Sequence, residues 1–340
     1  MFGIKTKFIK LIDPYLNNDN LTNVRLDPSG ITCNHKCVMC WRQQLTKMQR
    51  KELTKNFQEN KLNLDDYKQL INSLPKTVKK IELVGAGEPL MFSDIKKLIR
   101  FIKQKKYSCS LITNGVFLNK SIRQILIASN WDYIRVSLHA GTEKTYKKIH
   151  GKDDFKNVIG NIKALLKERK NKLPYIKLLF VIQKQNFHEI KNFVTLAEKI
   201  GVDEIEFDYL TPNSKKELFL NENELTLVKK QFYKTNIPLK NNIESVKKML
   251  TNNAWSTNRE KKEFFLKNRT CQLHHLEISQ TGITVPCCLL WNSEINKNLN
   301  IKKIDIKNIW KIYKPLRSNL NKGKFPQDCI KNCYYDLNSR

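Results

Sequence analysis

The sequence predicts an α/β fold built on a parallel sheet. Between residues 22 and 210, short runs of β-branched and apolar residues alternate with stretches that have the apolar periodicity of amphipathic helices. The runs with the length and composition of strands are 23–27, 80–85, 110–114, 133–138, 175–182 and 204–210. Right-handed crossovers join strands at this spacing into a parallel sheet, which is either open or closed into a barrel.

Helical segments fill the connections between these strands. The segments with helical periodicity are 64–74, 93–104, 158–169 and 187–200. The last one has a shared apolar face, made of Ile190, Phe193, Val194, Ala197 and Ile200. Gly201 follows at the position of a C-cap glycine, so we expect the helix to end there.

The two ends of the chain differ from this α/β region. Residues 1–21 are predicted to be a short amphipathic lead-in, because lysines interrupt the apolar residues and no signal-peptide core is present. Residues 212–270 are rich in lysine, asparagine and glutamate and predict a helical bridge, with helices at 222–235, 242–250 and 259–267. No apolar run is long enough to cross a membrane, so we expect a soluble, cytoplasmic protein.

The formal net charge of the 340 residues is +30 at pH 7. Such an excess of lysine and arginine attracts polyanions, which allows for a nucleic-acid partner. However, the charges are scattered along the chain, and lysine, asparagine and isoleucine are abundant together, as an AT-rich genome would produce. Both interpretations remain open.

Nine cysteines, clustered at close spacing, indicate metal ligation rather than disulfides. Cys33, Cys37 and Cys40 follow the first predicted strand, after turn-forming residues at 28–30. Three thiolates on one tight loop leave one iron of a [4Fe-4S] cluster with an open coordination position, where a substrate can bind. The alternatives are a zinc knuckle, with His35 as a fourth ligand, and a group of free thiols.

The run CNHKCVMC resembles the CxxxCxxC signature of the radical S-adenosylmethionine (SAM) superfamily. The resemblance implies that residues 22–211 form a partial (β/α)6 TIM-like barrel, with the cysteine loop after its first strand. In that family the residue before the third cysteine is usually aromatic and lies near the adenine. Met39 stands there in this chain and offers a soft apolar contact instead.

A second motif supports the resemblance. The family carries a GGEP-like segment after the second strand, and this chain has GAGEP at that place, made of Gly85, Ala86, Gly87, Glu88 and Pro89. The resemblance implies that the small residues let the backbone approach the methionine amino group of S-adenosyl-L-methionine. It also implies that the carboxylate of Glu88 accepts a hydrogen bond from that ammonium.

Polar residues also lie at two later strand ends. By analogy with the family, Asn114 and Ser137 are candidate contacts for the ribose or carboxylate of SAM, although both residues fit equally well as caps of strand ends. His139 is a candidate for proton exchange or substrate contact, or else a hydrogen-bonded structural histidine. Arg135 either reaches a carboxylate of SAM or substrate, or forms a structural ion pair.

Residues 271–340 hold the remaining cysteine cluster. The pattern Cys271, Gly282, Cys287 resembles the opening of the SPASM or Twitch extensions, which hold auxiliary clusters in many radical SAM enzymes, and we expect a hairpin turn at Thr281 and Gly282. The resemblance implies a small α+β module with a second [4Fe-4S] cluster. Its expected ligands are Cys271, Cys287, Cys329 and Cys333, with Cys288 as a possible substitute. A structural zinc site on the same thiolates is the alternative.

The resemblance also implies a reaction. A reduced [4Fe-4S] cluster would cleave SAM to a 5'-deoxyadenosyl radical, which abstracts a hydrogen from a peptide, a sugar or another small metabolite. The auxiliary cluster would assist oxidation or modification of that substrate, and an electron donor such as flavodoxin or ferredoxin is the expected partner. The alternative function is a non-catalytic iron-sulfur module that binds nucleic acid through its basic surface.

Overall fold

The computed structural model describes residues 20–210, 214–244, 246, 273–287, 290, 296, 298–327 and 329. Several expectations fall on other residues and lie outside this described part. They are most of the lead-in, the predicted helix at 259–267, most of the one at 242–250, and the ligand positions Cys271, Cys288 and Cys333.

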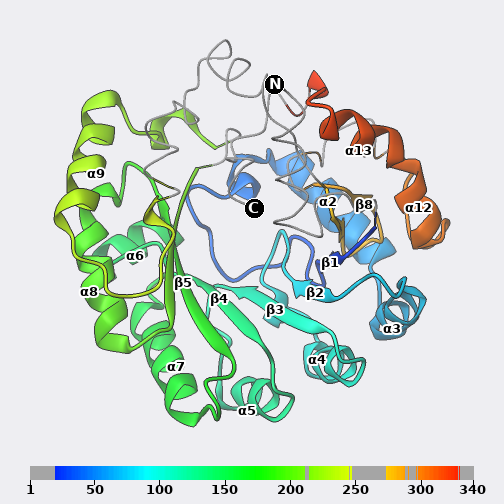
Figure 1. Ribbon diagram of the computed structural model, residues 1–340, viewed down its shortest axis with the longest axis horizontal. Helices are drawn as coiled ribbons and strands as arrows, with labels where there is room; N and C mark the ends of the chain where they lie inside the picture. The colour runs from blue at the N-terminus through cyan, green and yellow to red at the C-terminus, as the bar shows by residue number, and fades with distance from the viewer. Residues whose placement is uncertain are drawn as a thin grey trace, which may run out of the picture.

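The first six strands lie in one parallel sheet, in the order in which they follow each other along the chain. They are β1 (Asn23–Leu26), β2 (Lys80–Leu83), β3 (Ser108–Thr113), β4 (Tyr133–Ser137), β5 (Tyr175–Ile182) and β6 (Glu204–Tyr209). Each overlaps its predicted run, and the curved sheet with its outer helices confirms the predicted barrel-like α/β fold (Figure 1).

Helices surround the convex side of this sheet (Figure 1). The predicted ones are confirmed as α3 (Leu64–Ser73), α4 (Ile95–Gln104), α7 (Phe155–Glu168), and α8 (Ile190–Ile200) with the preceding 3-10 turn η3 (Phe187–Glu189). The helix α9 (Glu222–Lys234) confirms the one expected at 222–235 and is followed by helical residues at 243, 244 and 246. Gly201 ends α8 in the left-handed conformation, with φ of 80°, as predicted.

Between residues 22 and 210, three helices were not predicted: α2 (Lys47–Asn60), α5 (Lys120–Ala128) and α6 (Glu143–His150). None of the residues of α2 is buried, so its sequence has little apolar periodicity to detect. Cap signals were nevertheless present. Thr46 and Gln49 form a capping box at the start of α2, and Thr142 caps α6.

The C-terminal residues extend the same sheet. The strand β7 (His275–Ile278) pairs in parallel with β1, and β8 (Thr284–Val285) pairs antiparallel with β7. The predicted turn is confirmed, because Gly282 lies between the two strands with φ of 85°. Two helices, α12 (Ile306–Ile312) and α13 (Lys314–Asn321), follow. The segment expected to form a separate module therefore adds strands beside the first strand of the barrel.

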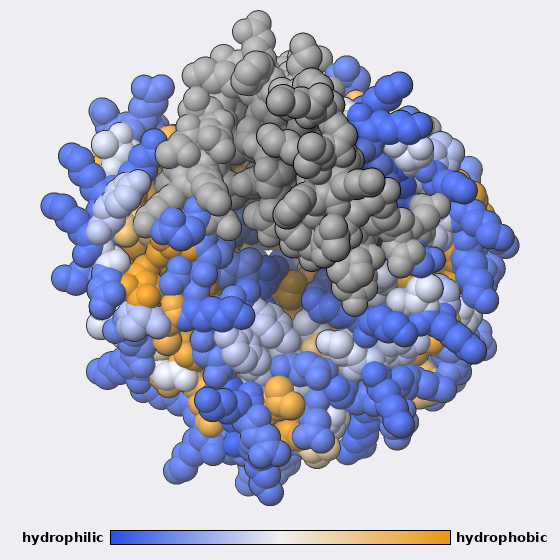
Figure 2. Space-filling view, in the orientation of Figure 1, coloured by the Kyte–Doolittle hydropathy of each residue, from blue (hydrophilic) through white to orange (hydrophobic). Residues whose placement is uncertain are grey.

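The sheet and its helices enclose one apolar core that includes Cys109, which is buried in β3. Because the six strands are parallel, their carboxyl ends meet at one edge, where this class of fold places its ligands. Hydrophilic residues surround the face shown in Figure 2 instead of gathering over one group of helices. Within the described ranges, no helix is both long and apolar enough to span a bilayer.

Candidate functional site

The cysteine triad lies on the loop between β1 and the 3-10 turn η1 (Trp41–Gln44), at the carboxyl edge of the sheet. All three thiols are free and half-buried. Burial raises the pKa of the Cys37 thiol, and Cys40 and Cys33 raise it further. The structure thus places the three predicted ligands on one short loop.

Each thiol has a different nitrogen-bearing side chain as its neighbour. Nδ2 of Asn114 lies 3.9 Å from Sγ of Cys33. Nδ1 of His150 lies 3.3 Å from Sγ of Cys37, and Nε of Arg42 lies 3.3 Å from Sγ of Cys40. These neighbours come from the loop after β3, the end of α6, and η1. Three separate elements thus position the three sulfurs.

Arg42 also fixes the backbone of the loop. Its Nη1 donates to the carbonyl of Ile31 at 2.9 Å, and its Nη2 donates to the carbonyl of His35 at 3.4 Å. Burial alone lowers the pKa of Arg42, but the charges of Cys40 and Cys33 outweigh it, so the pKa lies above its ordinary value. The guanidinium is therefore charged and holds the loop on both sides of Cys33.

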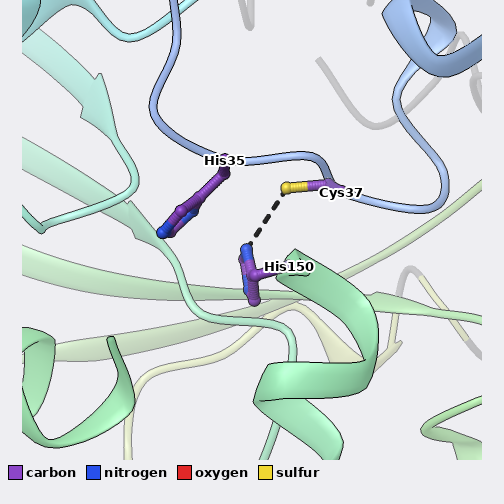
Figure 3. A group of neighbouring side chains, drawn as sticks. All are labelled: His35, Cys37 and His150. Carbon is purple, nitrogen blue, oxygen red and sulfur yellow. Dashed lines mark hydrogen bonds between the residues drawn. The ribbon is translucent and has the colours of Figure 1, made fainter. Parts of the chain in front are cut away.

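The loop is also bound to the end of α6. Backbone amides of Lys36 and Val38 donate to the carbonyls of His150 and Ile149. The side chains of Cys37 and His150 point toward one another across this contact, with His35 beside them (Figure 3). One ligand atom from each of these three residues lies within 4.8 Å of the others. His35 also contacts Asp154, at 3.0 Å from Nε2.

Asp27 joins the cysteine loop to the GAGEP segment. Oδ1 of Asp27 accepts from the backbone N–H of Gly30 at 2.9 Å, and Oδ2 accepts from the N–H of Ala86 at 3.1 Å. Burial raises the pKa of Asp27 to about 7. The buried carboxyl therefore holds two loops that the sequence separates by about sixty residues.

The glycines of GAGEP have a packing role that the sequence analysis did not anticipate. A Cβ atom on Gly85 would lie 1.9 Å from Oδ1 of Asp27, and one on Gly87 would lie 2.1 Å from the carbonyl oxygen of Thr32. The N–H of Glu88 also donates to this carbonyl, at 2.9 Å. The small residues were expected to make room for SAM. In the structure, they let two parts of the protein approach each other.

Glu88 is buried at the start of the turn η2 (Pro89–Met91), which begins at the predicted residue Pro89. Oε1 accepts from the N–H of Leu90 at 3.1 Å and from the hydroxyl of Thr113 at 2.7 Å, whereas Oε2 accepts from the N–H of Asn114 at 2.8 Å. Burial raises the pKa of Glu88 to about 7. The carboxyl thus links GAGEP to the end of β3.

The other predicted SAM contacts lie at the same edge of the sheet. Asn114 donates to Oδ1 of Asn34 at 2.8 Å, which places it directly over the cysteine loop. Met39 receives a contact from Nε2 of Gln183, at 3.6 Å from its sulfur, just beyond the end of β5. Ser137 is the half-buried last residue of β4.

The two catalytic candidates have structural contacts. His139 is buried with φ of 56°, and its Nδ1 accepts from the N–H of Val181 at 3.1 Å. Burial holds the pKa of His139 well below its usual value, so the ring is neutral. Arg135 pairs with Glu206 of β6 at 3.4 Å, two residues before the end of β4. These contacts favour the structural interpretation that the sequence left open for both residues.

Of the predicted auxiliary ligands, the described part of the chain contains Cys287 and Cys329. Both are half-buried, and both pack against the apolar core. Cys287 follows β8, directly beyond the predicted hairpin. Their association with Cys271 and Cys333 remains a prediction.

Sequence reasoning missed Asp27, Arg42 and His150. A signal existed for Asp27, which follows a strand and precedes the turn residues Pro28 and Ser29. Arg42 lies two residues after the third cysteine, close enough for its guanidinium to reach that loop. No sequence signal identifies His150, because its contact with Cys37 depends on how α6 packs.

The donor set fits a [4Fe-4S] cluster. Cysteine thiolates are the usual ligands of such clusters, and three of them on one loop leave one iron for another ligand. A buried guanidinium beside Cys40 supplies positive charge where thiolates would bring negative charge. The residues that would hold the cluster are Cys33, Cys37 and Cys40.

Comparison with solved structures shows the same fold. SuiB from Streptococcus suis, bound to precursor peptide SuiA, has a TM-score of 0.65 and 16% identity, and the match covers 98% of this chain and 74% of SuiB. Native anSMEcpe, with bound AdoMet and a Cp18Cys peptide, has a TM-score of 0.60 and 16% identity, over 93% of this chain and 87% of that one.

Sequence comparison gives the family. The chain is 38% identical over 136 residues to a probable GTP 3',8-cyclase of Saccharolobus islandicus, and 37% identical over 137 residues to one of Metallosphaera sedula. The first match covers 40% of this chain and 42% of the relative, so the chain spans about two-fifths of the length of the curated relatives that it matches. Residues 28–197, half of the chain, match the family model described as Radical SAM superfamily. Together with the cysteine loop, this match shows that the chain belongs to the radical SAM superfamily, whose enzymes use a [4Fe-4S] cluster and SAM.

Proposed function

We propose that this chain cleaves SAM reductively at a [4Fe-4S] cluster on Cys33, Cys37 and Cys40, and that it modifies a peptide by hydrogen abstraction. When bound, the reduced cluster supplies the electron that splits SAM into methionine and a 5'-deoxyadenosyl radical, which takes a hydrogen atom from the substrate. The main observation that supports this proposal is the loop of three free thiols, each of which lies beside a nitrogen-bearing side chain.

The residues around the triad have roles in binding and orientation. The carboxyl of Asp27 and the backbone N–H of Glu88 hold the GAGEP segment against the cysteine loop, so the methionine part of SAM would bind where these loops meet. Asn114, Ser137 and Met39 lie along the same edge and would contact the rest of SAM. Holding the reacting atoms close together and away from water is the main contribution of the protein.

A peptide substrate is supported by the extent of the structural match. The SuiB structure that covers 98% of this chain holds a precursor peptide, and anSMEcpe also binds a peptide. A nucleotide, which belongs to the small metabolites considered above, is the second candidate. Local identity of 38% to probable GTP 3',8-cyclases favours it, and so does the basic composition.

We also propose an auxiliary [4Fe-4S] cluster on Cys271, Cys287, Cys329 and Cys333. The half-buried thiols of Cys287 and Cys329 support it, because both pack against the core that includes β7. The cluster would assist oxidation of the substrate, and a flavodoxin or ferredoxin would supply electrons. The non-catalytic alternative, an iron-sulfur module for nucleic acid, does not explain why GAGEP packs against the triad loop.

Anaerobic reconstitution tests these proposals. The protein should form 5'-deoxyadenosine when it is reduced with dithionite in the presence of SAM. The variants C33A, C37A and C40A should form none, whereas C109A, which alters a buried cysteine of β3, should remain active. A wild-type protein that holds a reduced cluster and yet forms no 5'-deoxyadenosine would disprove the cleavage proposal.

Two further measurements test the second cluster and the substrate. C287A and C329A should each lose about four irons per chain while the triad cluster remains. GTP should leave the yield of 5'-deoxyadenosine unchanged, whereas a short peptide encoded beside the gene should raise it. Stimulation by GTP would replace the peptide proposal with the nucleotide one.

A further inference from the structure

Arg42 is a buried cation that has no carboxylate partner among the described residues. Its relative exposure is 6%, and its guanidinium contacts Sγ of Cys40 and two backbone carbonyls and is influenced by the thiol of Cys33. Four other arginines have carboxylate partners, namely Arg25, Arg123, Arg135 and Arg169. Arg42 thus differs from them in what balances its charge.

Burying a charge is unfavourable unless an opposite charge compensates for it. The groups near Arg42 that become negative are the thiols of Cys40 and Cys33, which bind metal as thiolates. A cluster on these ligands would supply the negative charge that compensates for the buried guanidinium of Arg42. The charge of Arg42 is therefore better compensated when the thiolates hold a cluster than in the protein alone.

We propose that Arg42 is a positioning residue that raises the reduction potential of the cluster held by Cys33, Cys37 and Cys40. A hydrogen bond to a ligand sulfur and a nearby positive charge both stabilise the more negative, reduced state. This inference rests on the proposed function, because it requires a cluster at the triad. It adds a residue that acts through Cys40 and that the family motifs do not include.

The fork of the guanidinium gives Arg42 a second effect. Its two terminal nitrogens bind the carbonyls of Ile31 and His35, on either side of Cys33, while Nε faces Cys40. A lysine would keep the charge but could not make these three contacts together. R42K and R42Q therefore separate the effect of charge from the effect of the fork.

The experiment is an anaerobic redox titration of the full chain without SAM, monitored by electron paramagnetic resonance. The signal of interest is the one that C33A, C37A and C40A lose. In R42Q, the one-electron equilibrium constant for reduction should fall at least about tenfold, which corresponds to a potential lower by about 59 mV. R42K should shift the potential less than R42Q does.

R123Q is the matched control. Arg123 is similarly buried, at 8% exposure, but it pairs with Glu168 on the outer helices. R123Q should leave the potential of the triad cluster unchanged. An R42Q potential equal to that of wild type, or an equal shift in R123Q, would overturn the proposal.

If R42Q holds no cluster at the triad, R42K decides the matter. A reduction equilibrium of R42K that lies below that of wild type, while R123Q stays at the wild-type value, supports the proposal, because R42K loses the hydrogen bond to Cys40. An R42K equilibrium equal to that of wild type, or loss of the cluster, would mean that Arg42 only holds the loop. A wild-type protein without any triad cluster would contradict the proposed function, whereas equal potentials in wild type and R42Q contradict this inference alone.

Discussion

The sulfur of Cys37 lies 3.3 Å from Nδ1 of His150, and the other ring nitrogen of His150 lies 2.9 Å from the carbonyl oxygen of Leu138. The carbonyl only accepts, so Nε2 carries the hydrogen. Burial lowers the pKa of His150 to about 3, which keeps the ring neutral. Nδ1 therefore accepts from the thiol of Cys37 in the metal-free protein. This contact orients the middle cysteine from a helix distant in sequence.

His150→Ala should destabilise the metal-free protein. The change leaves the Leu138 carbonyl without its donor, and it removes the ring that stacks on Tyr146 at 4.1 Å. We expect the free energy of unfolding to fall by about 3 kcal/mol, measured by urea denaturation under reducing conditions. The control His188→Ala alters an exposed histidine and should change stability by less than about 0.5 kcal/mol. An equal loss of unfolding free energy in the two variants would show that the contacts of His150 do not stabilise the metal-free protein.

Asp27→Asn should change how stability depends on pH. The folded pKa of Asp27 is about 7, above the unfolded value of about 3.9. The folded state therefore binds its proton more tightly, and this contribution to stability is lost as pH rises from about 4 to about 7. The asparagine variant lacks that loss, so the free energy of unfolding of wild type should fall relative to that of the variant between pH 5 and pH 8. Denaturation profiles that stay parallel over this range would contradict the expectation.

The parallel sheet could be predicted because each strand is an apolar run long enough to be recognised alone. The cysteine loop and GAGEP could be predicted because their spacing lies within short segments. The contacts of Arg42, Asp27 and His150 could not, since each depends on the packing of loops far apart in the sequence. The pairing of β7 with β1 could not be predicted for the same reason, because it joins residues about 250 positions apart.

Gly87→Ala and Gly160→Ala should have opposite effects on stability. A Cβ on Gly87 would lie 2.1 Å from the backbone oxygen of Thr32, which cannot move without shifting the cysteine loop. A Cβ on Gly160, within α7, meets nothing within 4 Å. We expect Gly87→Ala to lose about 2 kcal/mol or more and Gly160→Ala to gain about 0.5 kcal/mol, because alanine is favoured inside helices. Thermal unfolding of the metal-free variants measures both changes in stability. A Gly87→Ala variant as stable as wild type would show that the two loops do not pack this closely.

Glu88→Gln should weaken the binding of SAM. The carboxylate accepts from three donors: the backbone amides of Leu90 and Asn114, and the hydroxyl of Thr113. Glutamine has one accepting oxygen, so its amide N–H₂ must face at least one of these donors, and the unpaired group costs about 1–3 kcal/mol. The unpaired group lies in the segment proposed to bind the methionine part of SAM. We therefore expect the affinity for SAM to fall about tenfold, measured by equilibrium dialysis of the cluster-loaded protein. Glu198→Gln, at an exposed position of α8, is the control and should bind SAM as wild type does. If Glu88→Gln also binds SAM with wild-type affinity, Glu88 organises the loops without contributing to the SAM site.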